Sequence, residues 1–443
     1  MTRERTGGAS VFDGPRIVLL VVTFALILLG LVMVYSASMG EAVTNGTTDS
    51  SYYLLKQAVI VVIGSALGAI AWKFCPPHLW RGKATWFLLA FCVALLVATA
   101  VYGVATNGAQ RWVYIGSFSF QPSEVAKVVI IIVGARIYAD FREGLLKPRT
   151  AGVLAFGTVI VPVLFLFVAQ SDLGTTLIIA IGLVSVLWFG ECPLEIIAII
   201  CAVAVAFVLI AIFGTDYRSN RLYNFDPWSD GQNGGDRGFQ LVRSFYAFAQ
   251  GGVFGAGIGN STEKLTPLPE AETDFIFAII GEELGLVGAL LVIALFTIFL
   301  VAGMLVANES EDPFARMLAG SLTVVIVFQA FLNMGCVTGL LPTTGKPLPF
   351  ISSGGSSMFI TLIMVGLIMT AAPTGSKTSI YDKRRENLRI VRSVDSGNTR
   401  YFAGNKDSAR SFDGLRGSRS LGDNERSRKV RTFQPVALRR GRR

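Results

Sequence analysis

Charged residues are scarce in this chain of 443 residues. Asp, Glu, Lys and Arg make up 16% of it, against ~25% in a typical soluble domain, whereas hydrophobic residues make up 52% and the mean hydropathy is +0.57. So little charge cannot cover a water-facing surface of this size. The composition therefore excludes a soluble globular protein and predicts a chain for which lipid is part of the solvent.

Residues for metal or thiol chemistry are also few. The sequence holds one histidine, His78, and 5 cysteines without Cys-x-x-Cys spacing. These counts argue against a zinc site, a His-based catalytic triad and a disulfide framework. The cysteines fall mostly in or beside apolar runs, and we interpret them as buried small hydrophobic residues.

What the sequence does contain is a series of apolar runs of the ~20 residues that a helix needs to cross a bilayer. Their approximate bounds are 16–36, 53–73, 84–104, 123–140, 150–168, 173–190, 193–213, 274–302, 317–337 and 355–372. They predict an all-α polytopic membrane protein, with about ten transmembrane helices in one bundle over 16–372 after a short segment, 1–15. The first run resembles a signal peptide, but the further spans favour an uncleaved anchor.

Basic residues gather in alternate connections, and this asymmetry predicts the orientation in the membrane. The connections after the second and fourth spans contain Lys73, Arg81, Lys83, Arg142, Lys147 and Arg149. From Ala372 onward there are 19 Lys and Arg against 7 Asp and Glu. Both termini are therefore expected to be cytoplasmic, with the connections 105–122, 214–273 and 338–354 on the outer side.

The tail 373–443 is rich in Arg, Ser, Gly, Asn and Asp and poor in aromatic residues. Such a segment cannot bury enough apolar surface to fold alone, so we expect a disordered cytoplasmic tail. Its basic runs suit contact with anionic headgroups, and a docking segment for a cytoplasmic partner is the alternative. Because the basic excess is confined to this tail, it does not indicate a nucleic-acid-binding domain.

The connection 214–273 is too long for a simple turn and is not low in complexity. Its apolar residues between Phe239 and Phe248 predict a short amphipathic helix that lies in the membrane interface. The glycine-rich run 251–259 resembles a dinucleotide-binding fingerprint, but it follows no expected strand. We interpret it as a tight re-entrant loop, which is tolerated where backbone lines a cavity.

Asp274 is the candidate general base because it begins the eighth run at the outer boundary, against an apolar sequence. Partial burial there would raise the pKa of its carboxylate towards the working range of a base. The alternative is a helix N-terminal Asp favoured by the helix dipole, with Thr273 as the cap. Glu282 and Glu283, two turns further on, are interpreted as structural.

Other charged residues allow two interpretations each. Glu124 and Lys127 have i,i+3 spacing, close enough to pair, either as a buried tie or as part of a site. Five basic residues on the outer side would suit a pyrophosphate or ordinary headgroup anchoring: Arg111, Arg218, Arg221, Arg243 and Lys346. The stretch 339–357 is rich in proline and glycine, so it cannot be a plain helix and must line a cavity or pack against protein.

Several motifs, in this order along the chain, resemble the SEDS family of bacterial cell-wall polymerases, which includes FtsW, RodA and SpoVE. They are Tyr35-Ser36-Ala37-Ser38, Lys56-Gln57, Gly108-Ala109-Gln110-Arg111-Trp112, Gln121-Pro122-Ser123-Glu124, Asp172-Leu173-Gly174-Thr175, Leu268-Pro269-Glu270, Thr273-Asp274-Phe275-Ile276-Phe277, Gly281-Glu282-Glu283-Leu284-Gly285 and the stretch 339–357. The resemblance covers nearly all of the chain except its termini.

The resemblance implies a peptidoglycan glycosyltransferase that joins lipid II units into β-1,4 glycan strands, with Asp274 as the catalytic residue. The run 342–345, Pro-Thr-Thr-Gly, resembles the division branch, FtsW, more than the elongation branch, RodA. A class B penicillin-binding transpeptidase and other divisome proteins are the implied partners, at the septum of the bacterial cytoplasmic membrane.

A divalent cation, Mg²⁺ or Mn²⁺, would suit the pyrophosphate of the substrate. The expected substrate-binding residues are Arg111, Lys127, Glu124, Arg218, Arg221, Lys346 and Ser356.

The chain departs from the family pattern at four positions, where Ser171, Glu272, Lys346 and Ser353 replace the usual Pro, His, an apolar residue and Tyr. We expect the charge of Glu272 to raise the pKa of Asp274, and Lys346 to offset it. A lipid II flippase or transporter is the rival function, together with an elongation-type polymerase. A transporter should show paired broken helices in two related halves, and the sequence shows no such repeat.

Overall fold

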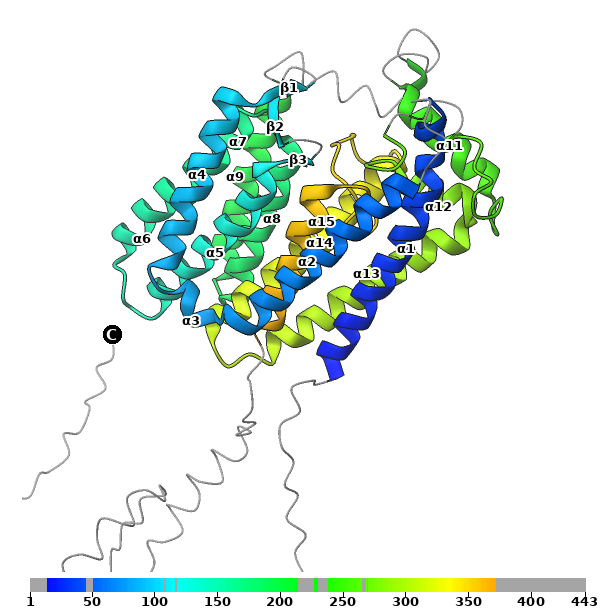
Figure 1. Cartoon of the computed structure of the whole chain (residues 1–443). Coiled ribbons are helices and arrows are strands. Elements are labelled where there is room, and N and C mark those ends of the chain that lie inside the picture. The colour runs from blue at the N-terminus through cyan, green and yellow to red at the C-terminus, as the bar shows by residue number, and fades with distance from the viewer. Residues whose placement is uncertain are drawn as a thin grey trace, which may run out of the picture. The chain divides into compact units, whose positions relative to one another are not determined.

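The computed structural model describes residues 14–44, 51–106, 109–115, 118–213, 227–229, 238–264, 268 and 270–371. Its longer helices are α1 (Gly14–Thr44), α2 (Ser51–Phe74), α4 (Ala84–Tyr102), α5 (Pro122–Arg142), α8 (Leu173–Phe189), α9 (Leu194–Phe213), α11 (Phe239–Gly251), α13 (Gly285–Asn308), α14 (Pro313–Val337) and α15 (Gly355–Met369). Its shorter ones are α3 (Pro77–Trp80), α6 (Pro148–Ala155), α7 (Val161–Val168) and α12 (Ile276–Glu283), with a π-helical turn at Phe156–Ile160 and a 3₁₀ turn at Pro227–Ser229. Figure 1 shows their arrangement.

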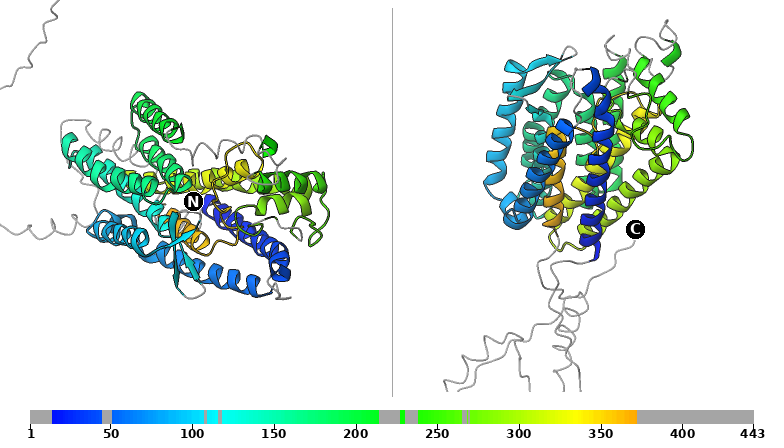
Figure 2. Two further views of the ribbon diagram at one scale, coloured as in Figure 1. Left: turned by 90° about the horizontal axis from the view of Figure 1, so that it is seen from above. Right: turned by 45° about the vertical axis from the view of Figure 1, so that its right-hand side comes forward.

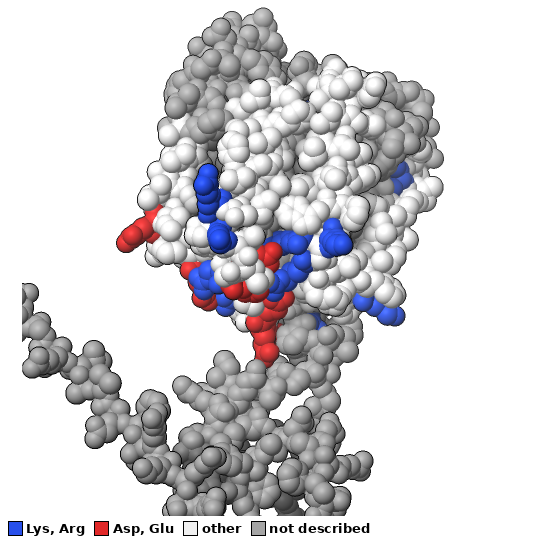
Figure 3. All heavy atoms as spheres, turned by 90° about the vertical axis from the view of Figure 1, so that its left-hand side faces the viewer, with Lys and Arg blue, Asp and Glu red and all other residues white. Residues whose placement is uncertain are grey.

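The predicted fold class is confirmed, because each predicted span falls on a helix or on consecutive helices. Within the described residues, 6 helical stretches are long and apolar enough to cross a membrane: Gly14–Met39, Ser51–Phe74, Ala84–Tyr102, Pro148–Val168, Gly285–Asn308 and Pro313–Val337. Shorter apolar helices lie at Leu173–Phe189, Leu194–Ala206 and Gly355–Met369. In Figure 3, charged side chains gather mostly at the lower end of the helices, and the surface above them carries few charged side chains.

Helix α14 forms the centre of the core, since nearly all of its side chains are buried. It packs against α8, α13, α15 and α5, while α2 packs against α15 and α1 against α13. The α2–α15 contact is close because a Cβ at Gly366 would lie 2.1 Å from the carbonyl oxygen of Gly68. Such small residues let membrane helices approach each other. Seen from above, α9 extends away from the rest of the bundle (Figure 2).

The eighth predicted span, 274–302, differs from the structure in two ways. The chain is helical over α12 and α13, with a break at Leu284 and a left-handed Gly285 (φ 67°) between them. At Gly285 a Cβ would lie 2.4 Å from the backbone nitrogen of Gly255, so only glycine fits. Asp274 therefore lies in a turn before α12, outside the spanning helices.

A small antiparallel sheet between α4 and α5 was not predicted. Its strands are β1 (Val104–Thr106), β2 (Ala109–Ile115) and β3 (Phe118–Phe120), in the order β1-β2-β3. β-Branched and aromatic residues in β2 are typical of a strand and would have been a usable signal. The sheet matters for the site because β2 carries Arg111.

The amphipathic helix predicted between Phe239 and Phe248 is present as α11, and its position in the membrane interface stays a prediction. Its apolar side packs against protein, with the Phe248 and Phe277 rings 5.9 Å apart. Ser244 Oγ donates to the carbonyl oxygen of Val337 at the end of α14 at 2.9 Å. The helix therefore stabilises α12, which follows Asp274.

The glycine-rich run 251–259 forms a tight loop, as predicted, and its re-entry into the membrane stays a prediction. Ala256 and Gly257 donate their N–H groups to the carbonyl oxygens of Glu282 and Glu283 at 2.9 and 3.0 Å. The loop thus lies on the junction between α12 and α13. The predicted tail, 373–443, and the predicted N-terminal segment, 1–15, except its last two residues, lie outside the described residues, so both stay predictions.

Candidate active site

Hydrogen bonds to the backbone fix the turn that contains Asp274. The N–H groups of Thr273 and Phe275 donate to the carbonyl oxygen of Glu270 at 3.1 and 3.2 Å, which forms a tight turn. The carbonyl oxygen of Asp274 accepts from Asn333 Nδ2 at 2.7 Å. Phe275 and the first residues of α12 are buried in the core. The carboxylate is therefore presented by a turn that is anchored on both sides.

The side chain of Asp274 lines a small pocket between α14 and the segment 338–354, which we call the Pro–Gly segment. The other lining residues are Phe275, Asn333, Cys336, Val337, Thr343, Thr344, Gly345 and Lys346. Gly345 has φ 64°, and a Cβ there would lie 3.7 Å from Asp274 Oδ2. The pocket thus combines a carboxylate with hydroxyl, thiol and amide groups next to apolar walls.

Burial is the main cause that raises the pKa of Asp274 from 3.8 to about 7, and the nearby charge of Glu270 is the second cause. The hydroxyl of Thr273, which donates to Oδ1 at 3.2 Å, opposes this shift. The described residues form no ion pair with Asp274. A carboxylate with a pKa near 7 is suited to accept a proton at neutral pH.

Among the acidic residues, Glu270 raises the pKa of Asp274, whereas the sequence predicted Glu272 for this role. The carbonyl oxygen of Glu272 accepts from the N–H of Ser353 at 2.8 Å. Two of the family departures, at 272 and 353, are thus joined by a backbone hydrogen bond. The turn folds the side chain of Glu270 onto Thr273, whose hydroxyl shares its one proton between Glu270 Oε2 at 2.7 Å and Asp274 Oδ1 at 3.2 Å.

Lys346 links the Pro–Gly segment to the start of α8 through an ion pair with Asp172. Its ammonium group lies 3.0 Å from Asp172 Oδ2, and both side chains are buried. The prediction that Lys346 supplies outward-facing charge and offsets the acidic residues near Asp274 is therefore wrong. Asp172 caps α8 through the N–H of Thr175 at 3.1 Å and also accepts from the hydroxyl of Ser123 at 3.1 Å.

Glu124 and Lys127 form a second buried tie. Their charged groups lie 2.9 Å apart at 0 to 1% exposure, and Lys127 Nζ also donates to Gln329 Oε1 at 2.6 Å. Gln329 in turn donates to the carbonyl oxygen of Pro347 at 3.0 Å. The predicted pairing is thus confirmed, and its contacts are those of a structural link to the Pro–Gly segment.

Arg111 lies in strand β2 of the small sheet, and its side chain donates hydrogen bonds to backbone carbonyl oxygens. Its Nε and Nη2 donate to the carbonyl oxygens of Gln170 and Ser171 at 2.8 and 2.6 Å. These bonds hold Ser171 in a left-handed conformation, with φ 49°. Ser356 is buried at the start of α15 and does not line the pocket of Asp274. Arg218 and Arg221 lie outside the described residues.

The carboxylates of Glu282 and Glu283 hold the segment 261–264, which follows the glycine-rich loop, in agreement with their structural interpretation. Glu282 accepts from the N–H of Thr262 at 2.7 Å and from the hydroxyl of Ser261. Glu283 lies 2.9 Å from Lys264 Nζ and accepts from the hydroxyl of Ser36 at 2.6 Å. These contacts leave neither carboxylate available for chemistry.

A family model described as "Cell cycle protein", for FtsW, RodA and SpoVE, matches residues 16–377. The chain belongs to this family. A relative from Geobacter metallireducens, named probable peptidoglycan glycosyltransferase FtsW, is 37% identical over 362 residues, which cover 80% of this chain and 94% of the relative. The relative of the same name from Nitrosomonas europaea is 38% identical over 80% of this chain and 91% of its own length.

Solved structures agree with this membership. A chain from the structure titled "Structural coordination of polymerization and crosslinking by a peptidoglycan synthase complex" matches with a TM-score of 0.64 at 25% identity, covering 80% of this chain and 96% of that one. RodA from Thermus thermophilus has the same fold, with a TM-score of 0.56 at 24% identity over 80% of this chain and 94% of its own. The chain is accordingly a membrane-embedded peptidoglycan glycosyltransferase of the FtsW/RodA/SpoVE family.

One polar residue of this family member's site was not predicted. Asn333 contacts Asp274 and lines its pocket, yet the sequence analysis did not name it. It lies in the apolar run of α14, where a buried amide is costly and therefore informative. The same cost applies to Asn and Gln as to charged residues, so the amides of Asn333 and Gln329 in this apolar run are a usable sequence signal.

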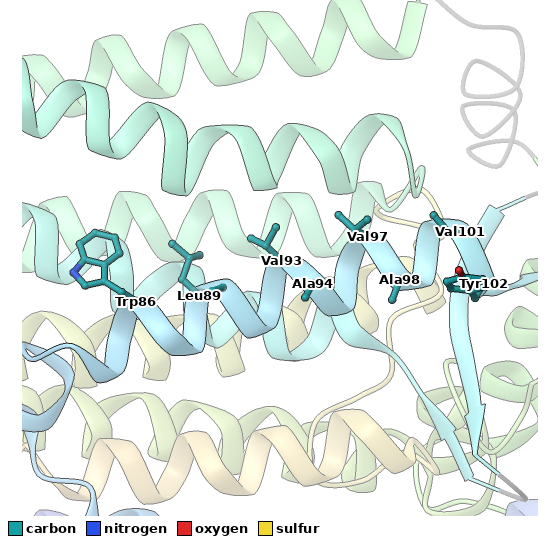
Figure 4. Close-up of a pocket in the computed structure, with 9 residues that line it drawn as sticks. Trp86, Leu89, Val93, Ala94, Val97, Ala98, Val101 and Tyr102 are labelled. Carbon is teal, nitrogen blue, oxygen red and sulfur yellow. The ribbon is translucent and has the colours of Figure 1, made fainter.

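A larger groove follows α4, and its lining is apolar. It is bordered by Trp86, Leu89, Ala90, Val93, Ala94, Val97, Ala98, Val101 and Tyr102 (Figure 4). Among the described residues, no side chain with a carboxylate, amide or basic group lines it, so it offers nothing for glycosyl transfer. In a membrane-embedded enzyme of this family, such a surface suits contact with lipid chains.

Proposed function

We propose that this family member polymerises lipid II, with Asp274 as the general base. The observation that carries the proposal is that the carboxylate of Asp274 differs from the other buried carboxylates in its contacts and its pKa. Among the described residues, Asp172, Glu124 and Glu283 are ion-paired and Glu282 accepts several hydrogen bonds. Asp274 has no ion pair, lines a pocket and has a pKa of about 7.

The chemistry is a single displacement. Asp274 removes the proton from the 4-hydroxyl of the acceptor sugar, and that oxygen attacks the anomeric carbon of the donor from the face opposite its pyrophosphate. The C–O bond to the pyrophosphate breaks, and the anomeric centre inverts to a β-1,4 bond. A single carboxylate suffices because the leaving group is already activated and needs no general acid.

The leaving pyrophosphate requires positive charge. Arg111 is the candidate, since two of its nitrogens hold backbone carbonyls and it keeps further N–H groups. Lys127 is less suited because Glu124 and Gln329 occupy its ammonium group in a buried position.

A divalent cation fits this scheme with few protein ligands. The described residues bring no three His, Cys, Asp or Glu side chains together around a metal position. Mg²⁺, however, is commonly held by one or two carboxylates together with substrate phosphates and water. In this scheme the phosphates of the substrate and water would hold most of the ion's coordination sites, and the ion would supply charge to the departing pyrophosphate.

The proposed setting is septal cell-wall synthesis, with the site on the outer face and both termini in the cytoplasm. A class B penicillin-binding transpeptidase and other divisome proteins are the proposed partners. The basic connections and the relatives named FtsW support this setting. The run 342–345 favours the division branch over the elongation branch.

The test uses purified protein in vesicles with labelled lipid II, with Mg²⁺, Mn²⁺ or a chelator. Wild type should form glycan chains and Asp274→Asn should not, while Glu283→Gln, if folded, should retain activity. Chains made equally fast by Asp274→Asn would refute the base assignment. Lipid movement between leaflets without polymer would establish a transporter instead.

A further inference from the structure

The amide of Asn333 joins two walls of the pocket. Its side chain is 2% exposed, and its Nδ2 donates to the carbonyl oxygen of Asp274 at 2.7 Å and to that of Lys346 at 2.8 Å. An amide nitrogen carries two protons, so these contacts occupy both of its donors. Asn333 therefore fixes the turn of the base to the Pro–Gly segment.

The same contacts determine which end of the amide is free. If the side chain were flipped, its oxygen would face two carbonyl oxygens, and none of these three atoms can donate. Oδ1 is thus the remaining end, and it is buried with no hydrogen-bond partner among the described residues. Native proteins rarely leave a buried acceptor unpaired without a use for it.

We propose that Oδ1 of Asn333 accepts a hydrogen bond from the acceptor sugar. The donor would be a hydroxyl or amide N–H next to the hydroxyl that Asp274 deprotonates. The inference rests on the proposed function and extends it, because a residue on α14 then contacts both the turn of the base and the substrate. Asn333 is accordingly a substrate-binding residue as well as a positioning residue for Asp274.

Ser321 provides a matched control on the same helix. Its Oγ is also buried without a hydrogen-bond partner among the described residues, but Ser321 does not line the pocket of Asp274. A general effect of removing an unpaired polar atom from α14 would be seen in both Ser321→Ala and Asn333→Ala. A contribution to substrate binding would be seen only at Asn333.

The experiment combines these variants with acceptor analogues that lack one donor each, at the hydroxyls beside the reacting one or at the acetamido N–H. With wild type, one analogue should react up to about tenfold more slowly, the value of one hydrogen bond. With Asn333→Ala, kcat/KM should fall about 10²-fold for the natural acceptor. The same analogue should then suffer no further loss, and Ser321→Ala should behave as wild type throughout.

A second variant covers the case in which Asn333→Ala does not fold. Asn333→Gln keeps an amide that can donate and accept, but its extra methylene displaces the oxygen, so kcat/KM for the natural acceptor should fall and the same analogue should lose little more. The inference is wrong if every analogue loses the same factor in wild type and in the folded Asn333 variant. If wild type makes no polymer at all, the proposed function itself fails.

Discussion

Asp172 and Asp274 both lie against the Pro–Gly segment, but their surroundings differ in kind. Asp172 accepts from Lys346, Thr175 and Ser123 at 2.8 to 3.1 Å and is sealed in the protein. Asp274 receives one side-chain hydrogen bond, from Thr273 at 3.2 Å, and no ion pair within the described residues. The comparison indicates that the first carboxylate maintains the structure and that the second is kept free for chemistry.

Asp274→Asn should separate the two roles most strongly. Removal of a general base costs about 10²–10⁴-fold in rate, whereas the fold should persist because the backbone contacts of the turn remain. The measurement is chain formation from labelled lipid II together with a thermal unfolding curve. Loss of folded protein in this variant would show that Asp274 is a structural residue like Asp172.

Asp172→Asn and Lys346→Met should each destabilise the protein by about 3–5 kcal/mol, because each leaves an uncompensated buried charge. The double variant should recover most of this loss, since no lone charge remains. Thermal unfolding of the two single variants and the double variant measures the coupling. Additive losses would mean that the 3.0 Å contact between these residues contributes nothing as a pair.

The sequence predicted the membrane helices well because their signal is local. The apolar runs predicted the bounds of the spanning helices, and the i,i+3 spacing of Glu124 and Lys127 predicted their ion pair. The Asp172–Lys346 pair could not be predicted, since its partners lie far apart in sequence and meet only through packing against α8. The break at Gly285 and the role of Asn333 likewise depend on backbone groups from distant parts of the sequence that lie next to these residues only in the folded protein.

The effect of Asp274→Asn on stability should depend on pH. The pKa of Asp274 is raised from 3.8 to about 7, so its contribution to stability is fully present below pH ~4 and is lost as the pH rises through 7. Asp274→Asn should therefore raise the melting temperature most at pH 8, less at pH 5 and little below pH ~4. An equal change at all of these pH values would contradict the raised pKa.

Glu270→Gln should have the smallest effect. Its charge is the second cause of the raised pKa of Asp274, after burial, so its removal should move the acidic limb of the activity profile slightly to lower pH. The matched variant is Glu272→Gln, which should leave the limb in place. A larger shift from Glu272→Gln than from Glu270→Gln would show that the two roles are exchanged.

The most direct measurement of the central claim is the pH dependence of kcat/KM for polymerisation by wild type. Because Asp274 must be ionised to accept a proton and its pKa is about 7, the rate should rise roughly tenfold per pH unit below that value and level off above it. A rate that is flat between pH ~5 and ~8 would contradict the account.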